Sequence, residues 1–133
     1  MIPKLERFDH IHLYVANREA AADWYEKHLG FKINAKLAFW AENPDGPLTV
    51  DDPTGLIHLA LFQRDNLVPS TGIAFGARGE EFLKWKSYLE QKDLLLRCTD
   101  HKVAWSVYFN DLDGNMHEIT TYEYGFVTDR LAV

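Results

Sequence analysis

The sequence predicts an α+β fold in which two modules, each ordered strand, helix and three strands (βαβββ), follow each other along the chain. Three observations predict it: strand-like runs with alternating apolar residues, two segments with helical spacing of apolar residues, and the same element order in both halves. The modules are expected at about residues 6–66 and 67–126 of a single domain of 133 residues. No residue-level repeat between the halves accompanies this order.

The first module is expected to begin with a strand over residues 8–15, FDHIHLYV. Asn17 is suited to cap a helix that runs through about His28, and Gly30 is suited to end it. Three further strands are expected, the last two separated by the turn-rich stretch ENPDGPLTVDDPTG; they cover residues 31–36, 37–41 and 56–63.

The second module is expected to begin with a strand over residues 71–77 and a helix from about Glu80 to Gln91. Three strands follow, with the turn NDLDGN before the last of them, at about residues 95–99, 104–109 and 116–122. A half of this length cannot bury its own sheet face. The two sheets are therefore expected to curve together into a cup or to pack against a partner chain.

Composition excludes several functions. The chain has 20 acidic and 14 basic residues, a net charge of −6, and no Lys/Arg cluster, so nucleic acid is not an expected partner. The start, MIPKLERFD, has no apolar signal region, and no run approaches the roughly 18 apolar residues of a membrane helix. A cytoplasmic location without membrane contact is expected. Because Cys98 is the only cysteine, a metal would be held by His, Asp or Glu.

Three residues are candidates for one metal site: His10 in the first strand, His58 in LIHLALF, and Glu118 in DGNMHEITTY. Two imidazoles and a carboxylate with open positions suit Fe(II), Mn(II), Ni(II) or Zn(II). Each residue also has a structural interpretation. His10 could be a surface histidine, His58 a buried one bonded to Tyr14, Tyr108 or a carboxylate, and Glu118 an ion-paired residue of a sheet edge.

Other polar and aromatic side chains have two interpretations each. Tyr108 could donate a hydrogen bond to an oxyanion or belong to the core. Trp40 and Trp105 could line a pocket or belong to the core. The remaining histidines are interpreted as structural or exposed: His28, His101 and His117.

Two segments carry a resemblance to a known family. DHIHLYVANREAAADWYEKHLGFKI near the start and VYFNDLDGNMHEI near the end resemble the signature ends of the vicinal oxygen chelate superfamily. This superfamily includes glyoxalase I, fosfomycin-modifying enzymes, extradiol dioxygenases and bleomycin-resistance proteins. The likeness covers essentially the whole chain and implies a curved, cup-shaped mixed sheet with the helices on its outside.

The resemblance also implies where metal ligands lie, namely on the first and last strands of each half. His10 matches the first-strand ligand, His58 falls on the last strand of the first half, and Glu118 matches the closing glutamate after Asp-Gly. Tyr108 falls where fosfomycin-modifying relatives keep a tyrosine near the substrate. The pattern fails at Gly72, where a histidine two residues before Ala-Phe is usual. His12 could supply a replacement group, although its position two residues from His10 makes ligation of one ion by both awkward.

Three functional interpretations remain. The first is a metal-dependent lyase, transferase or dioxygenase that forms a small homodimer. Its ion (Fe, Mn, Ni or Zn) binds two adjacent oxygens of a small substrate. In it, Tyr108 and His12 orient substrate or move a proton, and four side chains contact substrate: Tyr14, Trp40, Phe75 and Trp105. The alternative is a metal-free protein of bleomycin-resistance type that sequesters an aromatic or drug-like ligand. A third possibility is a catalytically silent domain with a regulatory role.

Overall fold

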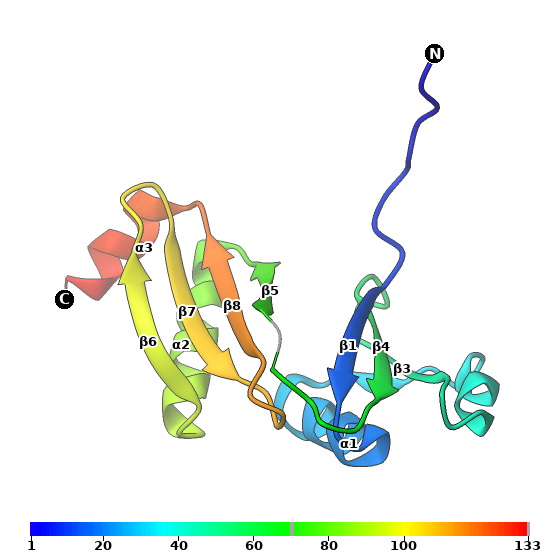
Figure 1. Cartoon of the computed structure of the whole chain (residues 1–133). Helices are drawn as coiled ribbons and strands as arrows, with labels where there is room; N and C mark the ends of the chain where they lie inside the picture. The colour runs from blue at the N-terminus through cyan, green and yellow to red at the C-terminus, as the bar shows by residue number, and fades with distance from the viewer. Residues whose placement is uncertain (70, 133) are drawn as a thin grey trace. The chain divides into compact units, whose positions relative to one another are not determined.

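The chain forms two compact units, here called unit 1 (Met1–Val68) and unit 2 (Pro69–Val133). They are described by a computed structural model that covers residues 1–69 and 71–132 (Figure 1). Within these residues each unit contains one four-stranded mixed sheet. The predicted α+β class and the two βαβββ modules are confirmed, while the joining of both modules into one domain stays a prediction.

Unit 1 has the strand order β1-β4-β3-β2, in which β1 runs parallel to β4 and the other pairs are antiparallel. A parallel pair needs a crossover connection, which here includes the helix α1. The elements are β1 (Ile11–Val15), α1 (Arg18–Leu29), β2 (Lys32–Ile33), the 3₁₀ helix η1 (Ala38–Glu42), β3 (Pro47–Asp51) and β4 (His58–Gln63).

Helix α1 begins and ends where the sequence predicts. The Asn17 side chain accepts a hydrogen bond from the backbone N–H of Ala20 at 2.8 Å. Gly30 ends the helix with φ of 76°, a left-handed conformation that glycine adopts without steric cost. The helix buries Tyr25 completely against the sheet face that carries Leu13 and Leu61. One face of the sheet is thus covered, and the other is left for the site.

The structure overturns one predicted strand in this unit and contains one strand that was not predicted. Residues 37–41 do not form a strand, because the Asn34 side chain accepts hydrogen bonds from the backbone N–H groups of Lys36 and Leu37 and turns the chain into η1. The missing strand is β3, which lies inside the stretch that the sequence analysis assigned to turns. Its alternating buried residues Leu48 and Val50 are the signal that the neighbouring Pro, Asp and Gly residues obscured.

A buried cation ties α1 to the segment between η1 and β3. The Arg18 guanidinium donates hydrogen bonds to the carbonyls of Ala41 and Asn43, each at 3.0 Å, and of Gly46 at 2.6 Å. Only 8% of Arg18 is exposed. Charge-assisted bonds to carbonyls that have left water are among the stronger polar contacts in proteins. Arg18 therefore holds the segment that carries Trp40 close to the sheet.

Unit 2 repeats the topology of unit 1, with the strand order β5-β8-β7-β6 and a parallel β5–β8 pair. In Figure 1 α2 lies behind the strands of this sheet, and it buries Phe82 and Leu89. The elements are β5 (Thr71–Gly76), α2 (Gly79–Gln91), β6 (Leu95–Asp100), β7 (Trp105–Asn110), β8 (Met116–Thr121) and α3 (Tyr124–Leu131). No helix in the described part of the chain is both long enough and apolar enough to cross a membrane.

Helix α3 was not predicted. It packs against α2, and the Trp105 indole N–H donates a hydrogen bond to the Thr128 hydroxyl at 2.9 Å. Val127 is its fully buried residue. A helix of eight residues is too short to be stable alone in water, so its stability comes from tertiary packing.

We expect Arg18→Met to lower the free energy of unfolding by about 2–3 kcal/mol, because three carbonyls lose a charged donor. Urea denaturation followed by circular dichroism measures the change. Lys27→Met, an exposed substitution on the same helix, is the control and should change stability by less than about 0.5 kcal/mol. Equal effects of the two substitutions would contradict the assigned role of Arg18.

Candidate functional site

The candidate site lies on the face of the unit 1 sheet that is opposite α1, here called the cavity face. Residues of one face alternate along each strand, and paired residues of neighbouring strands share it. The register pairs His12 with Ala60 and Asp51 with His58. The cavity face therefore carries His12, Tyr14, Thr49, Asp51, His58, Ala60 and Phe62.

A cavity of about 160 Å³ lies on this face. His10 and His58 both line it, with Thr49 and Ala60 from the sheet and Trp40 from η1. Two of the three predicted metal ligands thus share one cavity, as does the predicted pocket residue Trp40. A cavity of this volume can hold a ring of about the size of benzene.

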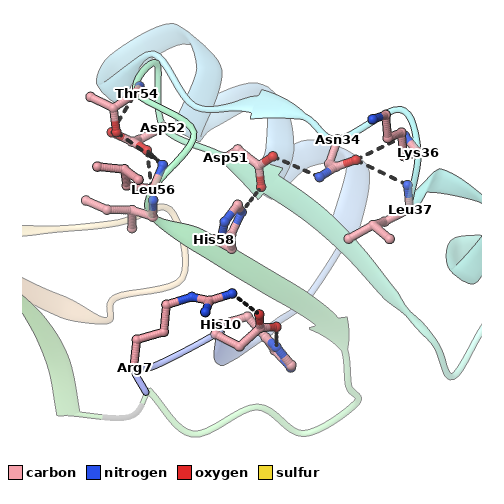
Figure 2. A network of polar contacts seen from close by, with 12 residues as sticks. Arg7, His10, Asn34, Lys36, Leu37, Asp51, Asp52, Thr54, Leu56 and His58 are labelled. Carbon is pink, nitrogen blue, oxygen red and sulfur yellow. Dashed lines mark hydrogen bonds and ion pairs between the residues drawn. The ribbon is translucent and has the colours of Figure 1, made fainter.

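His58 is held by a carboxylate from the neighbouring strand. Its Nδ1–H donates to Asp51 Oδ1 at 2.6 Å, and Asp51 Oδ2 accepts a bond from the Asn34 amide at 2.9 Å (Figure 2). Of the partners considered for His58 from the sequence, a carboxylate is the one observed. A carboxylate on Nδ1 fixes the tautomer and leaves the Nε2 lone pair available to a ligand.

His10 has a similar arrangement at the start of β1. Its Nδ1–H donates to Asp9 Oδ2 at 2.9 Å. This hydrogen bond is the main reason that the pKa of the Asp9 carboxyl lies below its usual value; the positive charges of Arg7 and nearby histidines act in the same direction, against desolvation. His10 Nε2 lies 3.0 Å from His12 Nε2, with the two rings stacked.

Asp9 and Asp51 are the site residues that sequence reasoning missed. Asp9 directly precedes His10 in the sequence, but the sequence does not show that its carboxylate accepts a hydrogen bond from the His10 ring. Asp51 could be connected with His58 only through the pairing of β3 with β4, and β3 itself was not predicted. Carboxylates bonded to the second ring nitrogen of a histidine are typical of metal-binding histidines.

Glu118 belongs to unit 2, where it lies on β8 between Ala74 of β5 and Tyr108 of β7. Within the described part of unit 2 no Lys or Arg forms an ion pair with it, so the ion-paired interpretation is not supported. Tyr108 is a buried residue of this sheet. Its hydroxyl is 2.9 Å from His101 Nε2, and the Arg97 guanidinium lies 4.2 Å from its ring centroid.

Two predicted substrate contacts lie on the other side of the unit 2 sheet. Phe75 pairs with Ile119 and contacts the buried His117 ring, on the face that α2 covers. Trp105 stacks on Tyr124 of α3. Neither shares the face of Glu118. Apolar residues occur on both faces of these strands, so alternation alone could not assign the aromatic side chains to a pocket.

Gly72 is fixed by a close backbone approach. A Cβ atom at this position would lie 1.3 Å from the Met116 carbonyl oxygen, where the β5–β8 register shifts. No larger side chain fits there without a backbone movement, so this strand cannot supply the usual histidine. In the described residues no three His, Cys, Asp or Glu side chains already surround one point. The donor chemistry of His10 and His58, each backed by a carboxylate, nevertheless fits a divalent cation.

The fold and this arrangement define a class of protein, and comparison with solved structures supports the fold. An integron cassette protein from the mobile metagenome of the Halifax Harbour sewage outfall is similar with a TM-score of 0.74 and 18% identity, over 88% of this chain and 99% of that one. The fosfomycin resistance protein FosX from Listeria monocytogenes has a TM-score of 0.71 and 14% identity, over 96% and 99%. Lactoylglutathione lyase from Agrobacterium tumefaciens has a TM-score of 0.63 and 23% identity, over 89% and 96%.

The family is shown by the sequence itself. The family model of the Glyoxalase/Bleomycin resistance protein/Dioxygenase superfamily matches residues 7–119, and the chain therefore belongs to this superfamily. The resemblance read from the two signature segments is confirmed. A search of curated proteins found no match to the chain.

We expect Gly72→Ala to lower the stability of the protein by about 1–3 kcal/mol, because the new methyl group collides with the backbone of β8. Thermal unfolding measures the loss. Gly76→Ala on the same strand is the matched control, since a Cβ atom there meets nothing within 4 Å. A Gly72→Ala protein as stable as the Gly76→Ala protein would show that the close approach is not rigid.

Proposed function

We propose that the protein is a divalent-metal-dependent enzyme that acts on a small oxygen-rich substrate. His10 and His58 of unit 1 are the first two ligands, and Glu118 is the third ligand expected from the family resemblance. One observation carries the proposal: both imidazoles line the same cavity, and each gives its Nδ1–H to a carboxylate, so each can offer Nε2 to a cation.

A bound Fe, Mn, Ni or Zn ion would act as a Lewis acid on two adjacent substrate oxygens. The chain's own residues have separate tasks. Asp9 and Asp51 accept the Nδ1–H of the two imidazoles and fix their orientation, so that Nε2 is the atom offered to the cation. Trp40 limits the size of the molecule that enters the cavity. Tyr108 and His12 are the proposed proton carriers, since each has a polar atom in a hydrogen bond with another histidine.

A metal-free binding protein is the second candidate, and two observations favour it. Gly72 removes a usual ligand position, and the cavity face presents Tyr14 and Trp40, which are 49% and 44% exposed. Flat aromatic side chains of this exposure suit an aromatic ligand. Metal binding decides between the two candidates.

We expect protein purified without chelators to contain about one divalent ion per chain, and dialysis against a chelator to lower its melting temperature. A bound ligand stabilises the folded state by mass action, so adding the metal back should restore that temperature. Elemental analysis and differential scanning fluorimetry measure both effects. Absence of bound metal, together with no response to any divalent ion, would support the metal-free alternative.

The ligands are tested by His10→Ala, His58→Ala and Glu118→Gln, each of which should reduce the metal content. Full retention after all three substitutions would contradict this ligand set. Sedimentation of the same samples tests the expected homodimer.

We expect Asp51→Asn to weaken metal binding by about tenfold or more, because an amide orients His58 less well than a carboxylate does. Isothermal titration with zinc measures the affinity. Asp45→Asn is the control, since Asp45 is exposed and remote in sequence from both ligands. The role of Asp51 would be refuted if both variants bound zinc as the unaltered protein does.

A further inference from the structure

We infer that His12 is also a metal ligand, so that His10 and His12 bind the ion together as a pair from one strand. The inference rests on the proposed function and extends its ligand set. It reverses the expectation from sequence that ligation by both would be awkward, and it gives His12 the role of a ligand in place of that of a proton carrier.

The geometry of the two rings carries the inference. Residues two apart in a strand point to the same side, and the two Nε2 atoms lie 3.0 Å apart. With metal–nitrogen bonds of about 2.0–2.1 Å, donors at this separation meet the ion at an angle of about 95°. That angle fits neighbouring positions of an octahedron, which suits Fe(II), Mn(II) and Ni(II).

The hydrogen bonds of the two rings show how an ion could replace the contact between the two Nε2 atoms. Asp9 accepts the Nδ1–H of His10, so Nε2 of His10 carries a lone pair and accepts a bond from the Nε2–H of His12. Binding an ion between the two Nε2 atoms requires His12 to carry its proton on Nδ1 instead. His12 is exposed, so water can exchange that proton. The pair needs a change of tautomer and no movement of the backbone.

The residues around His12 favour its role as a metal ligand. Its ring packs against Phe62, with ring centroids 4.8 Å apart, which limits its rotation. Its partner on β4 is Ala60, whose small side chain leaves room beside the imidazole. His10 directly precedes Ile11, which pairs with Leu59, and His10 and His58 line the same cavity. All three imidazoles therefore lie on one side of two adjacent strands.

This arrangement compensates for the donor that Gly72 does not supply. In the described residues no three donors already surround one point, so the His10–His12 pair would make the first two bonds to the ion. His58, which lines the same cavity as His10, is a third imidazole of unit 1, and the remaining positions stay open for substrate oxygens.

The test is titration of the full chain with cobalt(II), followed by its visible absorption. We expect His12→Ala and His12→Phe to weaken cobalt binding by more than about tenfold and to change the spectrum. His12→Phe keeps a ring against Phe62 and so separates ligation from packing. Tyr122→Phe, at an exposed position of unit 2, is the control for cobalt affinity, and circular dichroism verifies that each variant is folded.

A second readout is the nitrogen NMR spectrum of the zinc-loaded protein, in which His12 should be in the Nδ1–H tautomer with Nε2 bound. Cobalt affinity unchanged in both His12 variants but lost in His10→Ala would overturn the inference and leave the proposed function intact. No cobalt binding by the unaltered protein would overturn both.

Discussion

The parallel pairing of β1 with β4 is the constraint on which the rest of unit 1 depends. A parallel pair requires a crossover, and the crossover includes a helix that must cover one face of the sheet. The apolar residues of both strands turn toward that helix, so their polar residues are collected on the other face. Because the register is fixed by this burial, His12 lies opposite Ala60, and His10 precedes it by two residues at the cavity that His58 also lines. The position of the imidazoles is a consequence of core packing.

The same topology has a different outcome in unit 2. Its first strand also runs parallel to its last, but the register shifts near Gly72, and the backbone of β8 occupies the space of a side chain. The corresponding face of unit 2 presents Glu118 and the hydrogen-bonded Tyr108 instead of imidazoles. Duplicated modules can therefore keep one fold while they present different polar side chains.

The sequence was sufficient for features that depend on local chemistry. Asn17 and Gly30 mark the ends of α1 because capping and left-handed conformations are properties of single residues. The sequence could not show β3, whose alternation is short and lies among turn-forming residues, nor α3, which is stable only through its contacts. The histidines could be proposed as ligands from the family resemblance. Their carboxylate partners could not, because the contact between Asp51 and His58 exists only once two strands are paired.

His10 lies at the end of an exposed segment, residues 1–9, which projects from β1 as extended chain (Figure 1). A polyhistidine affinity tag fused before this segment would be tethered about ten residues from the imidazole pair. Tethering over such a distance raises the local concentration of the tag to the order of millimolar. The tag would then compete with the protein for the same cations, and an apparent metal stoichiometry would describe the tag as much as the site. Purification handles for this protein belong at the other end of the chain, or must be cleaved before any metal is counted.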